Sequence, residues 1–406
     1  MSAPARAAVT GIGITSPLGG GCAATMEGIL AGRVVRGPVE IFDTEGCRCR
    51  EAAACPEDAL ARRPRQPRVV RLAQPALEEA LASAGLLAGG ARVAEAVAGM
   101  PCCISTTGGA MELGERFLAN ALRGKHHHAL AQVSRYQPHQ QVRELQRTFG
   151  LHGPSWIVAN ACASGANAIG HAWDLIACGR AECVLAGGYE ALTDLIFTGF
   201  DCLQSLSPTL CRPFDEERDG LMLGEGAAFL VLESEAHARA RGAVVLGWVA
   251  GYGHSTDLHH LTQPHPEGKA LAAAIAMAVR RSGSEPETVG YINAHGTATP
   301  MNDPAECAGY HAACGGGLGA ARVSSIKSAI GHTLGAAGAI EAAVTLRAAR
   351  AGRLPPQAAT RRPLAGMAGR LAGMGECWPE GRPRALSVNL GFGGSNAALI
   401  LERGEG

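Results

Sequence analysis

The 406-residue sequence predicts a layered α/β fold, and three observations support this prediction. Short runs of apolar and β-branched residues end repeatedly in Gly-rich turns and are followed by Ala-rich helical patterns, which is typical of a parallel sheet covered by helices. Hydrophobic residues make up 47% of the chain and charged residues only 18%, which suits a large packed core. A strand expected to end near Leu232 and another expected to begin near Val245 enclose the charged segment 233–241. This segment divides the chain into two related βα halves, 1–240 and 241–406.

The expected elements alternate along the chain. Strands are expected at 7–11, 156–160, 183–187, 227–232, 245–251, 291–294, 384–390 and 397–401. Helices are expected at 75–84, 165–178, 268–282, 304–312 and 335–351. Pro75 suits a first helical position, where the missing N–H of proline is not needed. Segments 45–68 and 354–383 lack periodicity, so we expect irregular structure in both and interpret the first as a surface excursion.

Charge and the N-terminal sequence limit the partners and the location of the protein. Thirty-six basic residues balance thirty-six acidic residues, so there is no overall field that would attract nucleic acid or an anionic membrane. The N-terminal segment lacks the apolar run of a signal peptide, and no stretch of about eighteen uninterrupted apolar residues occurs. We therefore expect a cytoplasmic protein without nucleic-acid or membrane partners.

Two clusters of potential metal ligands are better explained without a metal. The fourteen cysteines are scattered and show no CxxC spacing, so most are expected to be buried, reduced thiols. Cys47, Cys49 and Cys55 lack a fourth ligand at zinc-finger spacing. The three consecutive histidines at 126–128 point in different directions and are expected in an exposed loop. The sequence thus predicts no metal site.

The segment around Cys162 is the strongest indication of chemistry. An apolar strand leads into Asn-Ala-Cys-Ala-Ser-Gly and then into an Ala-rich helix, so Cys162 is expected at a sharp strand-to-helix turn. The positive end of the helix dipole would lower the thiol pKa below about 8.5 and favour a nucleophilic thiolate. A small buried cysteine is the alternative, and other motifs must decide between them.

Two histidines and a glycine-rich loop support the nucleophile. His295 directly follows an apolar strand, and His332 lies in a Gly-bounded turn before a helix of small residues. A lone loop histidine is usually on the surface or a satisfied core residue, but together with Cys162 the two support each other. Near the C-terminus the loop 391–395 contains Phe392. A simple hairpin explains its glycines, whereas a gate or an amide donor also explains the bulky phenylalanine.

With these motifs the sequence resembles the β-ketoacyl-acyl carrier protein synthases of the elongating, Cys-His-His type. The resemblance covers nearly the whole chain and rests on VTGIGITSPLG near the start, ACASG around Cys162, RPFDEERDGLMLGEGA at 212–227, NAHGTATPMND around His295, SSIKSAIGHTLGAAGAIE from 324, and NLGFGGSN near the end. It implies a thiolase-like fold in which the two halves pack as α/β/α/β/α layers.

The resemblance also implies a reaction. Cys162 would accept an acyl group from the phosphopantetheine arm of an acyl carrier protein, and a malonyl carrier would then lose carbon dioxide and attack it. Amides of Cys162 and Phe392 would hold the oxyanion, and His295 and His332 would hold the enolate, each donor contributing about 3 kcal/mol. No cofactor and no metal ion is required.

Further residues receive roles from the same resemblance. Lys327 would organise the site with Glu341, although an ordinary solvated lysine is the alternative. Other matching positions would bind substrate, the last two in a loop facing the Phe392 loop: Gly393, Thr107, Thr297, Thr299, Asp257 and Thr262.

One region departs from the family pattern. Thr106 and Thr107 occupy an acyl-pocket segment that is usually apolar, and a polar helix begins at His139. A tunnel lined by Gln140 or Gln141 would bury amides at a cost unless they were hydrogen-bonded. We therefore favour a specialised type II polyketide or polyene pathway over saturated fatty-acid synthesis.

Competing functions fit the sequence less well. A degradative thiolase would need a second cysteine near the GFGGSN loop, and an initiating synthase would have asparagine in place of His332. A non-catalytic chain-length partner would lack Cys162, and a thioester hydrolase would leave Lys327 and His332 without a purpose. By resemblance we expect a homodimer, or a heterodimer with a homologous ketosynthase or chain-length subunit.

Overall fold

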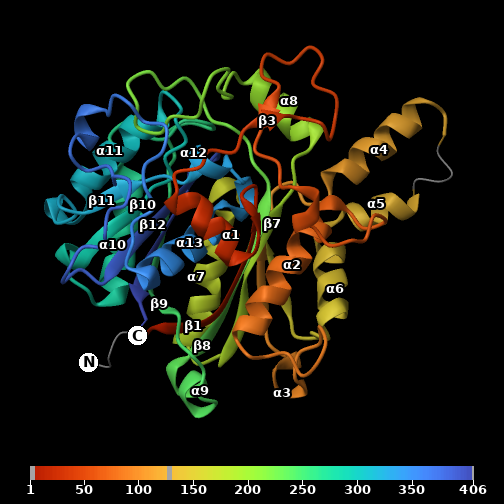
Figure 1. The fold of residues 1–406 in the computed structure, drawn as a ribbon, viewed down its shortest axis with the longest axis horizontal. Coiled ribbons are helices and arrows are strands. Elements are labelled where there is room, and N and C mark those ends of the chain that lie inside the picture. The colour runs from red at the N-terminus through yellow and green to blue at the C-terminus, as the bar shows by residue number, and fades with distance from the viewer. Residues whose placement is uncertain (1–4, 126–129, 405–406) are drawn as a thin grey trace.

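The computed structural model describes residues 5–125 and 130–404. Its main sheet has eleven strands in the order β11-β10-β12-β13-β9-β1-β8-β7-β5-β6, with β2 paired to β1 (Figure 1). The strands are β1 (Ala7–Ser16), β2 (Gly19–Gly20), β3 (Gly37–Pro38), β4 (Glu51–Ala52), β5 (Cys102–Ser105), β6 (Ser155–Val158), β7 (Cys183–Glu190), β8 (Gly226–Ser234), β9 (Gly247–Thr256), β10 (Val289–Asn293), β11 (Arg322–Ser324), β12 (Arg384–Gly391) and β13 (Ser395–Arg403).

Helices cover both faces of this sheet. They are α1 (Gly21–Leu30), α2 (Arg68–Ser83), α3 (Glu95–Ala98), α4 (Met111–Leu122), α5 (Leu130–Tyr136), α6 (Pro138–Phe149), α7 (Ser164–Ala177), α8 (Asp194–Cys202), α9 (Glu235–Ala240), α10 (Lys269–Ser282), α11 (Asn302–Ala312), α12 (Lys327–Ile330) and α13 (Ala337–Ala351). In Figure 1, α7 and α13 lie at the centre, while α2 and α10 lie on opposite sides of them.

The predicted layering is confirmed by the packing. Helix α13 contacts β7 and β8 of the N-terminal half and also β12 and β13 of the C-terminal half, and it packs on α7. Helix α2 covers β1 and β8, and α10 covers β9 and β13. Along β8, successive side chains enter two different cores, as the alternation of a strand requires. The layers are therefore α/β/α/β/α, and the site lies where the central helices meet the sheet.

Most expected elements are present, with two informative differences. All eight expected strands are found, while β5, β11 and the two-residue strands β2, β3 and β4 were not predicted. The expectation for Pro75 is wrong, because α2 begins at Arg68 and contains Pro75 in its interior. The carbonyl of Arg71, which a proline four residues later cannot bond, accepts the N–H of Ala61 at 2.9 Å instead.

The irregular segments were predicted with mixed success. Segment 354–383 contains only the short 3₁₀ turn Ala365–Met367, as expected. Segment 45–68 is largely irregular, but its interpretation as a surface excursion is wrong, since Cys49, Ala53 and Cys55 are buried. The histidines at 126–128 lie outside the described residues. Among the described residues, no helix is long and apolar enough to cross a membrane. The division at residue 240 stays a prediction, because strands of both halves join one sheet.

Candidate active site

Cys162 lies at the predicted strand-to-helix turn. It is in the 3₁₀ turn Ala161–Ala163, between β6 and the first residue of α7. Ala161 has a φ of 55°, a left-handed conformation that costs a non-glycine residue about 1–3 kcal/mol. The turn is fixed by Ser164, whose hydroxyl accepts the N–H of Asn160 at 2.8 Å. The strained turn holds the sulfur at one defined point.

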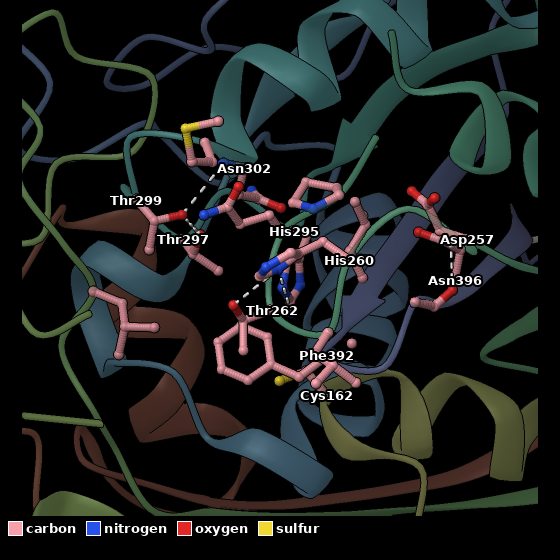
Figure 2. Close-up of a pocket in the computed structure, with 18 of the residues that line it drawn as sticks. Cys162, Asp257, His260, Thr262, His295, Thr297, Thr299, Asn302, Phe392 and Asn396 are labelled. Atoms are coloured by element: carbon pink, nitrogen blue, oxygen red, sulfur yellow. Dashed lines mark hydrogen bonds between the residues drawn. The ribbon is translucent and has the colours of Figure 1, made fainter. Parts of the chain in front are cut away.

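The three predicted reactive side chains converge. The sulfur of Cys162 and one ring nitrogen each of His295 and His332 all lie within 4.8 Å of one another. The two imidazole rings are 5.2 Å apart between centroids and nearly perpendicular, at 84°. All three side chains are buried, and Figure 2 shows Cys162 and His295 facing the same pocket. Residues spread over 170 positions of the chain therefore form one site.

The expected lowering of the thiol pKa is wrong. Burial raises the pKa of Cys162 to about 12, and it outweighs the opposing effects of the Lys327 charge and of the Phe392 N–H, which donates to the sulfur. Cys162 does precede a helix as predicted, but desolvation of the thiolate raises the pKa by more than the helix dipole could lower it. Cys162 is therefore protonated at neutral pH, and its proton must leave during the reaction.

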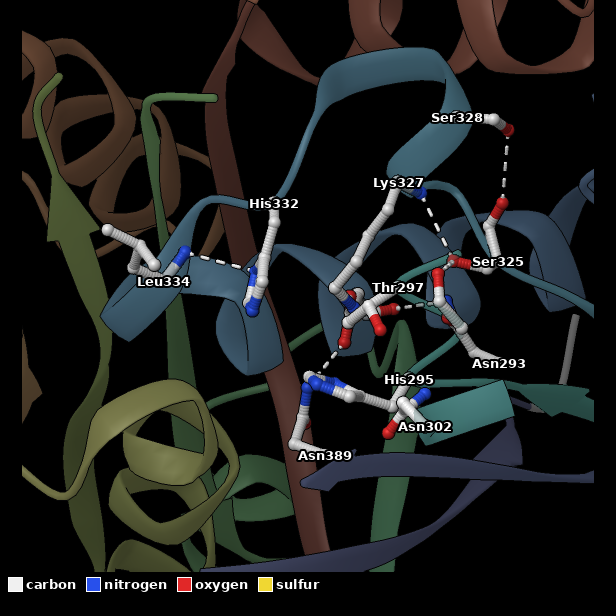
Figure 3. A network of polar contacts seen from close by, with 12 residues as sticks. Asn293, His295, Thr297, Asn302, Ser325, Lys327, Ser328, His332, Leu334 and Asn389 are labelled. Atoms are coloured by element: carbon white, nitrogen blue, oxygen red, sulfur yellow. Dashed lines mark hydrogen bonds and ion pairs between the residues drawn. The ribbon is translucent and has the colours of Figure 1, made fainter. Parts of the chain in front are cut away.

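Both histidines are neutral. Burial lowers the pKa of His295 and His332 well below the usual value, and the Lys327 charge lowers both further. The Nδ1 atom of His332 accepts the N–H of Leu334 at 3.3 Å, so the ring proton is on Nε2 (Figure 3). Within the described structure, that buried Nε2 has no hydrogen-bond partner. His332 thus presents a free N–H donor.

Lys327 is not a solvated lysine. Its ammonium group is buried and pairs with Glu341, which also accepts a hydrogen bond from Asn389 at 2.6 Å. In Figure 3, His295 and Asn389 are drawn together below the Lys327 side chain. The predicted pairing of Lys327 with Glu341 is present, and its electrostatic effect reaches Cys162 and both histidines.

At the end of β12, the backbone of Gly391 lies close to Cys162, and no side chain stands between them. A Cβ added to Gly391 would lie 3.3 Å from the amide nitrogen of Cys162. A side chain at this position would cover the amide that is expected to hold an oxyanion. Phe392 stacks on Phe200 of α8, with ring centroids 5.5 Å apart and an interplanar angle of 21°. Phe200 was missed, because nothing in its helical context marks it as a partner of a distant loop.

The loop 257–262 and the Phe392 loop, 391–395, are joined through their backbones. The N–H of Gly393 donates to the carbonyl of Leu261 at 2.7 Å, and the N–H of Asp257 donates to the carbonyl of Gly394 at 2.6 Å. Asp257 accepts hydrogen bonds within its own loop, and Thr262 donates its N–H to His260 at 3.1 Å (Figure 2). The predicted facing of these loops is therefore present, while Asp257 acts on loop shape.

Two cavities meet at Cys162. The first is lined partly by polar side chains, among them His260, Thr262, Thr297, Thr299 and Asn302. The hydroxyls of Thr297 and Thr299 are 3.0 Å apart. The second cavity, of about 250 Å³, has an entirely apolar exposed lining. It is formed by Thr107, Ala161, Cys162, Leu195, Ile196, Gly199, Phe200, Leu203, Leu334 and Phe392. Phe200 and Phe392 border both cavities.

The expectation of a polar acyl tunnel is wrong. Gln141 is buried outside the second cavity, where its amide donates to the carbonyl of Tyr136 at 2.9 Å. Gln140 is half-buried outside the second cavity and bonds to His139. Of the two threonines, only Thr107 reaches the cavity. Gln141 packs on the buried face of α6 with Val142, Leu145 and Phe149, and its amide is satisfied there by the backbone of Tyr136 rather than in the cavity.

A carboxylate that was not predicted fixes the His295 loop. Glu306 of α11 accepts the N–H groups of His295 at 2.6 Å and of Gly296 at 2.7 Å, and also the hydroxyl of Tyr310 at 2.5 Å. Burial and the nearby Asp303 raise its pKa to about 7. The sequence signal that could have identified Glu306 is its place one turn into the helix that follows the His295 motif.

The site residues also have the donor types of a zinc site, with one sulfur and two nitrogens. No other group of His, Cys, Asp or Glu in the described chain, including Cys47, Cys49 and Cys55, has its ligand atoms as close together. The expectation that the reaction needs no metal therefore stays a prediction.

Comparison with known proteins identifies the family. The N-terminal domain of β-ketoacyl synthases matches residues 5–238, and their C-terminal domain matches residues 246–361. This chain belongs to the β-ketoacyl synthase family. Family members are condensing acyltransferases, and the buried Cys-His-His site of this synthase suits that activity.

Relatives of this synthase come from both fatty-acid and polyketide synthesis. It is 34% identical over 427 residues to a Streptomyces cyaneus protein named as polyketide β-ketoacyl synthase 1, covering 98% of this chain and 97% of that one. It is 34% identical over 421 residues to 3-oxoacyl-[acyl-carrier-protein] synthase 2 of Synechocystis, covering 98% of each. The solved ishigamide ketosynthase/chain length factor is 30% identical with a TM-score of 0.89, over 99% of this chain and 100% of that one. The predicted thiolase-like ketosynthase fold is confirmed.

Proposed function

We propose that Cys162 accepts an acyl group from the phosphopantetheine arm of an acyl carrier protein and that this group then condenses with a malonyl carrier. The observation that carries the proposal is the convergence of one buried thiol and two neutral imidazoles within 4.8 Å. A thiol supplies the covalent intermediate, and neutral imidazoles supply N–H donors without a competing charge.

In acyl transfer, a bond forms between the Cys162 sulfur and the acyl carbon while the bond from that carbon to the carrier's sulfur breaks. The thiol proton passes to the departing carrier thiolate, which removes the need for a free thiolate at Cys162. The amides of Cys162 and Phe392 would hold the oxyanion, and the absence of a side chain at Gly391 leaves the Cys162 amide uncovered.

In condensation, the bond from the malonyl carbon to its carboxylate breaks, and carbon dioxide leaves. The electron pair forms an enolate, whose carbon attacks the acyl-Cys162 carbonyl. Cys162 departs as a thiolate and takes up one proton. The N–H donors of His295 and His332 would stabilise the enolate oxygen by about 3 kcal/mol each, and burial together with the Lys327 charge keeps both rings neutral.

The second cavity supports an apolar acyl chain, either a polyene or an alkyl chain. A poly-β-ketone would bury several carbonyls against a lining without exposed polar atoms, and each unpaired carbonyl costs about 1–3 kcal/mol. A specialised pathway that makes reduced or conjugated chains therefore fits the cavity better than one that makes poly-β-ketones.

Partners follow from the same proposal. The first cavity offers hydroxyls of Thr297 and Thr299 for a phosphopantetheine arm, and no other cofactor or metal is invoked. Strand β6 ends the sheet with an exposed edge, including Trp156, and a second subunit, identical or a homologous chain-length subunit, would cover it. We place the protein in the cytoplasm, where its fourteen free cysteines would stay reduced.

Intact mass spectrometry after incubation with a panel of acyl carriers tests the proposal. Wild type is expected to gain one acyl group and then release carbon dioxide and product with malonyl carrier, whereas Cys162→Ala should gain none. Cys183→Ala is the matched control, because burial raises the pKa of that thiol to about 12 as well. An adduct that survives Cys162→Ala would refute the nucleophile. Hydrolysis faster than condensation would indicate a thioesterase.

A further inference from the structure

Glu190, the last residue of β7, is a fully buried carboxylate that the proposed mechanism does not use. No Lys, Arg or His of the described chain lies within ion-pair distance of it. Burying an unpaired charge is costly, and burial raises the pKa of this carboxyl. Its negative charge also raises the pKa of Cys162, which disfavours the nucleophile. Glu190 is thus unfavourable both for stability and for the reactivity of Cys162, so we expect it to have a role in the site.

The hydrogen bonds of Glu190 join two segments that are otherwise far apart in sequence. One oxygen accepts the N–H groups of Gly108 at 2.8 Å and Gly109 at 3.2 Å and the hydroxyl of Thr106 at 3.3 Å. The other oxygen accepts the N–H of Thr107 at 2.8 Å and the N–H of Gly335 at 3.0 Å. One carboxylate therefore binds the loop 106–109 and the turn 333–335 together.

Each joined segment carries a different part of the site. Thr107 lines the apolar cavity, and Leu334, beside Gly335, lines it from the other segment. Leu334 also donates its N–H to Nδ1 of His332, which sets the tautomer of that ring. A Cβ on Gly335 would lie 2.6 Å from the Thr107 nitrogen and 2.8 Å from a Glu190 oxygen, so the segments touch directly.

We propose that Glu190 is a positioning residue that holds the turn of His332 against the wall of the acyl cavity. This inference rests on the proposed condensation. It assigns to Glu190 the alignment of the His332 N–H with the enolate, whereas the turn of Cys162 is fixed by Ser164 and receives from the two joined segments only one long hydrogen bond, at 3.5 Å, from the Thr107 hydroxyl. Misplacement of a reacting group by about 1 Å costs on the order of 100-fold in rate.

Glu190→Gln tests the proposal, because an amide nitrogen in place of either oxygen faces N–H donors instead of accepting from them. Two half-reactions are measured on folded protein: acylation of Cys162 by intact mass, and carbon dioxide release from malonyl carrier by the acylated enzyme. We expect carbon dioxide release to fall by about 10- to 100-fold and acylation to fall much less. A merely structural role would lower both in the same proportion.

Glu233→Gln is the matched control, since Glu233 is also a fully buried carboxylate but bonds Thr10, His237 and Arg241 away from the site. Equal scaling of both half-reactions in Glu190→Gln, as expected for the control, would overturn the inference. A wild type that neither acylates nor releases carbon dioxide would instead refute the proposed function.

Hydrogen exchange of wild type keeps the inference testable if Glu190→Gln does not fold. Because one carboxylate holds both segments, the amides of Thr107, Gly108 and Gly335 should exchange with the same opening free energy. If the Gly335 amide exchanged with a different opening free energy from the amides of Thr107 and Gly108, Glu190 would not be what holds the two segments together.

Discussion

Gly199 is expected to set how much acyl chain the apolar cavity accepts. It lies in α8, directly before Phe200, and lines the second cavity. A Cβ added at this position meets no atom within 4 Å, so the chain leaves open space where other helical residues would place a side chain. Glycine inside a helix lowers the stability by about 1 kcal/mol relative to alanine. Open space reserved for the acyl chain would explain why a glycine stands at this position.

Gly199→Leu adds four carbons to that space. If each displaces one methylene of a chain that fills the cavity, at about 0.8 kcal/mol per buried methylene, the loss is about 3 kcal/mol, or about 200-fold in kcat/KM. A two-carbon primer does not reach the added side chain, so the ratio of long-chain to short-chain kcat/KM should fall by nearly this factor. The folded state should not lose stability, since leucine is the better helix former.

The assay measures kcat/KM for acyl carriers from acetyl to dodecanoyl. Thr198→Leu is the matched control, because Thr198 is on the same helix but does not line the cavity. An unchanged chain-length profile for Gly199→Leu, or an equal loss for all primers, would refute the assignment of the second cavity to the acyl chain.

Three further substitutions have defined outcomes. Gly391→Ala should lower the condensation rate by about 100- to 1000-fold, because the new methyl group covers the Cys162 amide; a rate near wild type would exclude that amide as an oxyanion donor. Lys327→Met removes a charge that lowers the pKa of Cys162, so less thiolate should be present at a given pH. Iodoacetamide should therefore alkylate this thiol more slowly than in wild type from neutral to mildly alkaline pH, although the rate should still rise with pH in both proteins. Equal rates would show that Lys327 does not act on the sulfur. Phe200→Ala removes a ring stack worth about 0.5–1.5 kcal/mol, so the amides of the Phe392 loop should exchange about two- to tenfold faster in hydrogen-exchange measurements, and unchanged protection would contradict a role of Phe200 in holding the loop.

Local patterns in the sequence, taken together, predicted which residues meet at the candidate site. An apolar strand followed by a small-residue turn and a helix identifies the position of Cys162, and similar strand-to-turn patterns identify His295 and His332. These patterns span only a few residues each, and the backbone follows them because strand and helix propensities act over the same short range. The motifs that resemble the family predicted Lys327 and Glu341 in the same way.

Tertiary structure alone decided the environment of these residues. Burial raised the thiol pKa against the local helix dipole, because desolvation depends on everything packed around the sulfur. Packing placed the amide of Gln141 against the backbone of Tyr136 rather than in the cavity, and an N–H from outside the helix, that of Ala61, allowed Pro75 inside α2. Glu190 binds segments more than 220 residues apart along the chain. Solvent exclusion and long-range hydrogen bonds arise only when distant segments meet, so no short window of sequence contains them.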